Sequence, residues 1–192
     1  MNRFHRWYCR TSHWRHTIQS DILPWALQDV DLGDHVLEVG PGPGLTTDVL
    51  AGRVQQVTAL EIDGALAASL QARFSGSNVT VDEGDATAIP YPAGSFTGAV
   101  CFTMLHHVPS PSLQDRLLAE VRRVLRPGAT FAGSDSRTSL MFRLAHISDT
   151  MVVVDSDAFA DRLATAGFEQ VRVDTARHAF RFRGRVPDSS SA

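Results

Sequence analysis

The sequence predicts an α/β fold in which helices cover both faces of a doubly wound, mostly parallel sheet with one antiparallel edge strand. Three observations predict it. Short apolar segments alternate with helical ones along most of the 192 residues, and strands separated by helices form parallel βαβ units. The first apolar segment breaks into a glycine-rich turn that opens a helix. Near the end of the chain, two strands follow each other with a short connection, which favours an antiparallel hairpin.

The first part of the predicted fold runs from a strand at 36–39 to a fifth strand at 129–133. Between them we expect strands at 56–61, 79–83 and 97–103, and helices at 46–51, 65–74 and 112–125. The last of these helices gathers its Leu and Val side chains on one face. Pro127 and Gly128 follow it as stop signals.

The second part is predicted to contain helices at 139–146 and 157–166 and strands at 170–174 and 179–183. The final strand alternates Phe with Arg, which predicts one buried and one solvated face. The arginines of this region are Arg177, Arg181, Arg183 and Arg185. They either attract an anionic acceptor or protect an edge strand from aggregation, and we prefer the protective role.

Composition indicates a single domain at residues 1–186, with an N-terminal lid segment at 1–30 and a disordered tail at 187–192. A net charge of -3 gives no basic face, so we expect no nucleic-acid partner. Two cysteines without metal or disulfide spacing favour a reduced, cytoplasmic setting. We find no signal peptide and no apolar run that could span a membrane. We expect a monomer or a homodimer.

The glycine-rich turn differs from a dinucleotide-binding loop. Its three glycines, Gly40, Gly42 and Gly44, have G-x-G-x-G spacing, and prolines between them remove two N–H donors that a diphosphate would need. The carboxylate of Glu38 precedes the turn and would repel phosphate but attract a cation. The turn therefore suits a zwitterionic amino-acid end better than a pyrophosphate.

Polar side chains stand where the next strands end, which in a doubly wound sheet is where a ligand binds. Glu61 follows the second strand and could accept hydrogen bonds from both ribose hydroxyls. Asp85 follows the third strand and could accept the exocyclic amine of an adenine. His106 and His107 follow the fourth strand and place imidazoles at the mouth of the same site.

Together these segments resemble class I S-adenosylmethionine-dependent methyltransferases, which have a Rossmann-like fold. The resemblance runs from about Asp34 to Gly133, and its order and spacing are similar to a small-molecule subgroup that includes quinone-pathway C-methyltransferases. Thr97 and Ala129 depart from the subgroup's usual Asp and Gly. The resemblance implies S-adenosylmethionine as cofactor, S-adenosylhomocysteine as product, and these cofactor-binding residues: Glu38, Gly40, Gly42, Gly44, Glu61, Ile62, Gly84, Asp85, Ala86, Phe102 and Thr103.

The implied activity is in-line transfer of a methyl group to an O, C, N or S atom of a small-molecule acceptor, for which alignment of the reactants supplies much of the acceleration. His106 and His107 are the candidate catalytic bases, although both could instead shape the cofactor pocket. Two alternatives stay open: a protein that binds the cofactor without transferring methyl groups, and an NAD-dependent oxidoreductase.

Side chains outside the strand ends are candidates for the lid and the acceptor site. They are Trp7, Tyr8, Trp14, Asp135 and Phe142. The N-terminal aromatics would exclude water as a lid, or pack on the sheet edge. His13 and His16 have helical spacing, but no Cys or carboxylate motif accompanies them, so we predict no metal site.

Overall fold

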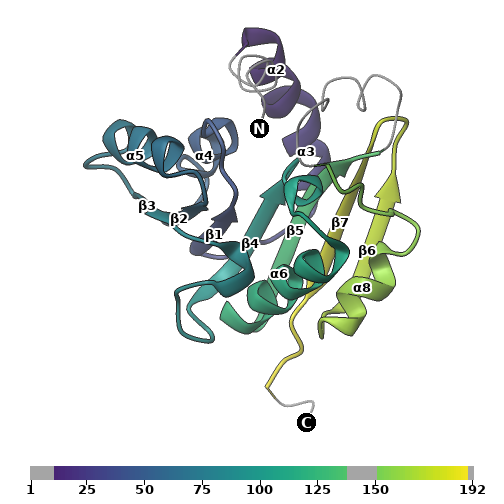
Figure 1. Ribbon diagram of the computed structural model, residues 1–192. Helices are drawn as coiled ribbons and strands as arrows, with labels where there is room; N and C mark the ends of the chain where they lie inside the picture. Colours follow the sequence, from purple (N-terminus) through teal and green to yellow (C-terminus); the bar gives the residue numbers. More distant parts are fainter. Residues whose placement is uncertain (1–10, 138–150, 190–192) are drawn as a thin grey trace.

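A computed structural model describes residues 11–137 and 151–189 and contains a seven-stranded sheet with the order β3-β2-β1-β4-β5-β7-β6 (Figure 1). The strands are β1 (His35–Val39), β2 (Gln56–Glu61), β3 (Val79–Glu83), β4 (Phe96–Phe102), β5 (Leu125–Ser136), β6 (Glu169–Thr175) and β7 (Ala179–Arg185). The larger helices are α4 (Leu45–Leu50), α5 (Gly64–Arg73), α6 (Pro111–Val124) and α8 (Phe159–Thr165). The predicted fold class is confirmed.

The N-terminal region folds as consecutive short helical pieces. These are α2 (Ser12–His16), a π-helical segment (Thr17–Ile22) and α3 (Leu23–Ala26). Thr11 caps the first of them, because its hydroxyl accepts a hydrogen bond from the Trp14 amide. The predicted helix at 139–146 lies outside the described residues.

The antiparallel strand does not lie at the edge, and this corrects the sequence prediction. β7 pairs antiparallel with β5 on one side and with β6 on the other, so β6 is the edge strand. The hairpin was predicted correctly, but the order of its two strands along the sheet depends on which one pairs with β5. That choice depends on tertiary packing, which the local pattern does not contain.

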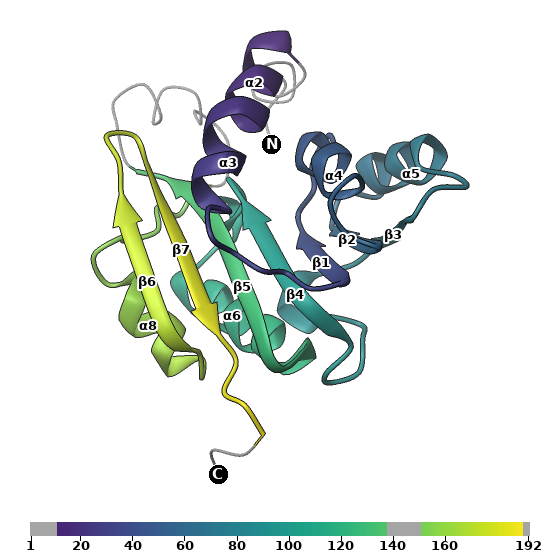
Figure 2. The same cartoon turned by 180° about the vertical axis from the view of Figure 1, so that it is seen from behind.

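One face of the sheet buries a continuous apolar core under α6 and α8, which lie in front of β4–β7 in Figure 1 and behind them in Figure 2. Leu117 and Val121 of α6 and Phe159 of α8 are fully buried there. Ser110 caps α6 through its hydroxyl, and Pro111 occupies the first turn. The cap explains why α6 begins one residue before its predicted start.

The other face of the sheet changes character from one side to the other. Over β1–β4 it carries a second apolar core with α4, α5 and the N-terminal helices. Beyond β5, the apolar side chains of the hairpin face the opposite way, because Phe180 and Phe182 of β7 point into the first core. Arg181 and Arg183 therefore fall on the second face, where Figure 2 shows β6 and β7 without a covering helix apart from α3 near one end.

Candidate functional site

The glycine-rich loop between β1 and α4 is built from left-handed backbone. Gly40, Gly42 and Gly44 have φ values of 66°, 56° and 78°. The Gly40 amide donates to the Leu60 carbonyl at 2.9 Å and so keeps the loop attached to β2. A Cβ added at Gly42 would meet no heavy atom within 4 Å, whereas one at Gly40 would meet Met104 Cγ at 2.3 Å. The space at Gly42 lets a ligand approach the backbone closely.

Glu38 is buried and holds α4 against β1. Its two carboxylate oxygens accept hydrogen bonds from the hydroxyls of Thr46 and Thr47, the second at 2.6 Å. Burial raises the pKa of Glu38 to about 7, and the two threonine hydrogen bonds offset only part of that effect. The acid implied to bind the cofactor thus also anchors the helix that follows the loop.

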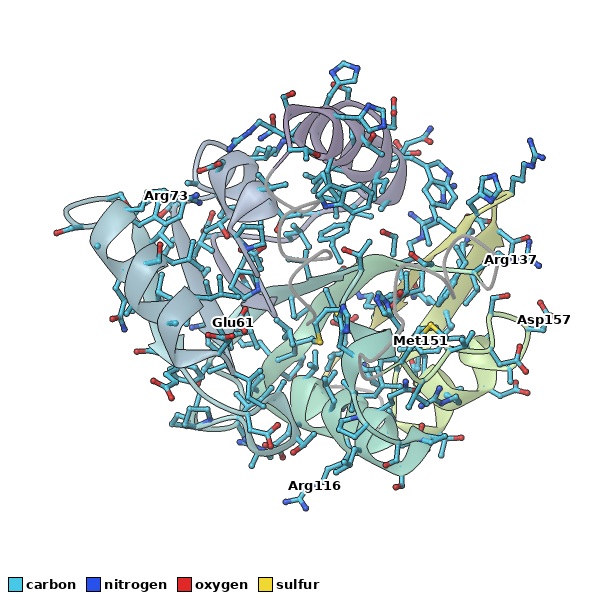
Figure 3. All side chains as sticks on the ribbon, turned by 45° about the horizontal axis from the view of Figure 1, so that its top comes forward. Glu61, Arg73, Arg116, Arg137, Met151 and Asp157 are labelled. Atoms are coloured by element: carbon cyan, nitrogen blue, oxygen red, sulfur yellow. The ribbon has the colours of Figure 1, made fainter. Side chains whose placement is uncertain are left out.

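Glu61 connects the end of β2 to the loop. One carboxylate oxygen accepts from the Gly42 amide at 2.9 Å and the other from the Asp63 amide at 3.0 Å. Asp63 in turn caps α5 by accepting from the amides of Ala65 and Leu66. The carboxylate is therefore fixed beside the open position of the loop (Figure 3).

Arg73 also contributes to the site, although no sequence motif indicates it. From the last turn of α5, its guanidinium donates to the carbonyls of Pro43 and Gly44, both at 2.9 Å. It also pairs with Asp48 at 3.2 Å, and Asp48 pairs with Arg15 of α2 at 3.2 Å. Arg73, labelled in Figure 3, thus fastens the loop to α5, and Asp48 links α4 to both Arg73 and Arg15. A basic residue in the last turn of a helix is common, so only the tertiary structure reveals this role.

The predicted nucleoside-binding segments lie at the ends of β2 and β3. Ile62 is 69% exposed, which is unusual for so large an apolar side chain. Gly84 donates its amide to the Glu61 carbonyl at 2.9 Å, which places the two strand ends side by side. Asp85 is exposed and caps a short helical turn that begins at Ala86, a half-buried residue.

The sequence predicted His106 and Asp135 separately, and the structure brings them together as a buried pair. His106 Nδ1 and Asp135 Oδ1 are 2.5 Å apart, and the side chains are 2% and 0% exposed. The His106 amide also donates to Asp135 Oδ2 at 3.2 Å. An ionised carboxylate only accepts hydrogen bonds, so a neutral imidazole at this position presents its Nδ1–H to Asp135.

The other predicted residues of this segment lie at the end of β4 or directly after it. The His107 ring lies 4.2 Å from the His106 ring between centroids. Thr103 has a positive φ of 48°, and its amide donates to the Ser134 carbonyl, which joins the ends of β4 and β5. The Phe102 side chain is buried in the second core.

Trp14 lies half-buried against the second apolar core. The other lid and acceptor-site candidates, Trp7, Tyr8 and Phe142, lie outside the described residues. Among residues 11–137 and 151–189 there is no group of three or more His, Cys, Asp or Glu side chains that could hold a metal ion. In the same ranges, no helix is long and apolar enough to cross a bilayer.

Comparison with known proteins agrees with this geometry. The model of a family described as "Methyltransferase domain" matches residues 37–133. A probable ribosomal RNA small subunit methyltransferase A of Natronomonas pharaonis is 36% identical over 154 residues, which cover 73% of this chain and 55% of the relative. The ubiquinone biosynthesis O-methyltransferase of Azotobacter vinelandii is 31% identical over 150 residues, which cover 74% of this chain and 63% of the relative. The chain therefore spans little more than half the length of these relatives.

A solved structure is similar over nearly the whole chain. It is a methyltransferase of Haloferax volcanii in complex with the Trm112 methyltransferase activator. The TM-score is 0.73 at 15% identity, and the match covers 97% of this chain and 99% of the other. At this identity the likeness concerns the fold.

Proposed function

Because the chain belongs to the methyltransferase domain family, we propose that it transfers the methyl group of S-adenosylmethionine to a small-molecule acceptor. The observation that carries the proposal is the position of the buried His106–Asp135 pair. It stands at the ends of β4 and β5, beside the strand whose glycine-rich loop leaves space for a ligand.

The residues around the loop fit this cofactor. Gly42 leaves its backbone open, and Glu61 holds a buried carboxylate next to it for the ribose hydroxyls. The exposed Ile62 offers an apolar surface for a purine ring, and Asp85 offers a carboxylate for the amine of that ring. The sulfonium of the bound cofactor supplies an electrophilic methyl group.

The His106–Asp135 pair favours an acceptor that loses a proton. In-line displacement needs alignment above all, but an attacking hydroxyl must also lose its proton. Asp135 orients the imidazole and would stabilise it once it is protonated. We therefore favour a hydroxyl group of a small molecule as the acceptor.

The names of the relatives divide between ribosomal RNA and a small molecule in ubiquinone biosynthesis. A net charge of -3 favours a small acceptor over RNA, because nucleic-acid binding depends chiefly on cations that neutralise phosphates. A histidine–carboxylate pair at the strand ends also suits the deprotonation of a hydroxyl group.

The cofactor site is tested by Gly42→Val, with Gly76→Val as the matched control. Both glycines have positive φ, and an added Cβ meets nothing within 4 Å at either one. Both variants therefore carry similar backbone strain, but only Gly42 lies in the loop. Calorimetry with S-adenosylhomocysteine should show binding by the parent and by Gly76→Val but not by Gly42→Val. If both variants bind S-adenosylhomocysteine equally well, the glycine-rich loop does not form part of the cofactor site.

The proton-accepting role is tested by Asp135→Asn. We expect kcat for methyl transfer from S-adenosylmethionine to a panel of small hydroxylated aromatic compounds to fall about 100-fold or more. The affinity for S-adenosylhomocysteine should stay within about twofold, and the pH dependence of kcat should change. Asp115→Asn, which removes a carboxylate from an exposed ion pair with Arg162, is the control. An unchanged rate in Asp135→Asn would contradict the role.

A further inference from the structure

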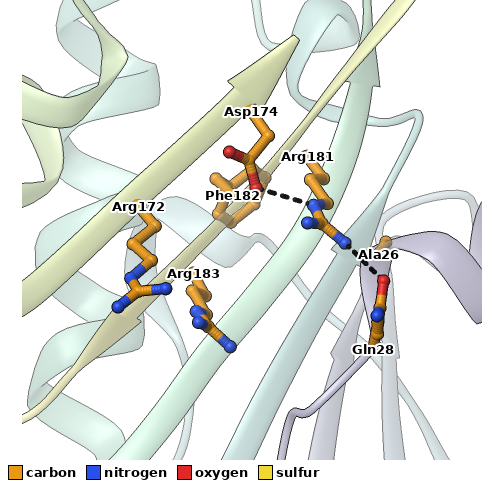
Figure 4. A pocket seen from close by; sticks show the side chains of 7 residues that line it. All are labelled: Ala26, Gln28, Arg172, Asp174, Arg181, Phe182 and Arg183. Carbon is orange, nitrogen blue, oxygen red and sulfur yellow. Dashed lines mark hydrogen bonds and ion pairs between the residues drawn. The ribbon is translucent and has the colours of Figure 1, made fainter. Parts of the chain in front are cut away.

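The β6–β7 hairpin carries an arginine-lined hollow that the proposed methyl transfer does not use. It lies between the end of α3 and the second face of the hairpin and is partly open to solvent, and Figure 4 shows the side chains that line it. Its lining residues are Ala26, Gln28, Arg172, Asp174, Arg181, Phe182 and Arg183. It thus gathers three guanidinium groups and one carboxylate.

Arg181 is already engaged and forms the fixed wall of the hollow. Its guanidinium pairs with Asp174 at 2.8 Å (Figure 4). It also donates to the Trp25 carbonyl at 2.5 Å and lies over the Trp25 ring at 5.3 Å. Asp174, the one carboxylate among the lining residues, is therefore already paired with Arg181. Arg181 serves to fasten the hairpin to the N-terminal helices.

The other two arginines stand opposite each other, and neither forms an ion pair with a carboxylate of residues 11–137 and 151–189. Arg172 and Arg183 are direct partners in the β6–β7 register. Arg183 donates to the Asp29 carbonyl at 3.3 Å, and Arg172 has no hydrogen bond or ion pair with any residue within 11–137 and 151–189. Like charges directly opposite each other on adjacent strands are destabilising.

Protection of a sheet edge explains only one of these residues. Arg172 belongs to the edge strand β6, where a charge discourages association with other chains. Arg183 belongs to β7, which is paired on both sides. Among the neighbouring carboxylates, Asp174 pairs with Arg181 and Asp188 pairs with Arg185. The unbalanced pair therefore calls for a ligand.

We propose that this hollow binds a dianionic phosphate, either inorganic or the end of a phosphomonoester, held between Arg172 and Arg183. Guanidinium groups bind phosphate oxygens in pairs through parallel N–H donors. A phosphomonoester carries a charge close to -2 near neutral pH and would neutralise both arginines. A carboxylate or a phosphodiester carries a charge of only -1 and would leave one arginine unbalanced.

The test is calorimetric titration of the full chain with inorganic phosphate at pH 8. Arg172→Gln/Arg183→Gln removes the proposed ligands, and Arg53→Gln/Arg116→Gln removes the same charge from two exposed arginines elsewhere. We expect the dissociation constant to rise about tenfold or more in the first double variant, because two sets of charge-assisted hydrogen bonds are lost. The control should stay within about twofold.

Titrations with other anions distinguish the source and the charge of the ligand. Phenyl phosphate should bind about as well as inorganic phosphate if the site takes a terminal phosphomonoester, and less well if it takes only the free ion. Dimethyl phosphate and acetate should bind more weakly than both. The proposal is overturned if these monoanions bind equally well, if both double variants lose affinity alike, or if the parent shows no saturable binding.

Two measurements, the melting temperature and the affinity for S-adenosylhomocysteine, distinguish a specific loss of phosphate binding from misfolding and from failure of the proposed methyl transfer. Without phosphate, Arg172→Gln/Arg183→Gln should melt at the same temperature as the parent or higher, because a like-charge pair has been relieved. Phosphate should raise the melting temperature of the parent only. Affinity for S-adenosylhomocysteine should be the same in all variants.

Discussion

At the scale of single residues, Glu38 makes the stability of the protein depend on pH. Its pKa is raised from 4.5 to about 7 because the carboxyl is fully buried. The folded protein therefore holds a proton that the unfolded chain releases between these two values. This contribution to the free energy of unfolding is complete below pH 4.5 and falls by up to about 3 kcal/mol as the pH rises to 7.

Glu38→Gln should remove this dependence. The amide cannot ionise, so the variant should gain stability relative to the parent between pH 5 and pH 8. Urea unfolding at both values measures the difference, and comparing the two proteins cancels the titration of every group they share. If the gap between them is the same at pH 5 and pH 8, Glu38 does not titrate in this window.

Residue types at the site could be predicted, but most of their partners could not. The carboxyl ends of parallel strands meet at one edge of a sheet, so Glu61, Asp85 and His106 follow from the positions of the strands alone. The bond between His106 and Asp135 joins residues 29 positions apart. It depends on how the segments after β4 and β5 turn, which local propensity does not determine.

At the scale of elements, α5 does more than cover β2 and β3. Arg73 at its end fixes two carbonyls of the glycine-rich loop. Arg73→Gln should loosen the loop and weaken S-adenosylhomocysteine binding about fivefold, which corresponds to about 1 kcal/mol for partly exposed hydrogen bonds. Arg53→Gln, at an exposed arginine, is the control. Equal affinities in the two variants would show that the loop holds its shape without Arg73.

Periodicity located the elements well where one face is buried. The strands at 56–61 and 79–83 were predicted with their observed bounds, and α6 was displaced by one residue. β5 is longer than predicted, Leu125–Ser136, because it pairs with β4 on one side and β7 on the other. Its additional residues include polar side chains, so the apolar pattern alone ended the strand too early.

At the scale of the whole molecule, aromatic packing fastens α8 to the β6–β7 hairpin. The Phe159 ring lies 5.4 Å from the ring of Phe180 and 5.0 Å from that of Phe182, and the side chain is fully buried. Phe159→Ala should lower the free energy of unfolding by about 3–5 kcal/mol, because a large cavity opens in the core.

Denaturant unfolding measures this loss, and hydrogen exchange should show β6 and β7 losing protection before β1 and β4. Phe159→Leu keeps most of the volume and should cost clearly less. A loss below about 1 kcal/mol in Phe159→Ala would mean that the hairpin is held chiefly by its backbone pairing.

The bond from Arg181 to the Trp25 carbonyl joins residues 156 positions apart, and this separation has a consequence during synthesis. Translation at about 5–20 residues per second places roughly 10–30 s between the emergence of the two partners from the ribosome. For that interval α3 has no hairpin to bind, and its Leu23 and Ala26 side chains, buried in the finished protein, have only part of their surroundings. The N-terminal helices therefore wait through most of synthesis for these contacts, which gives a chaperone time to act on them.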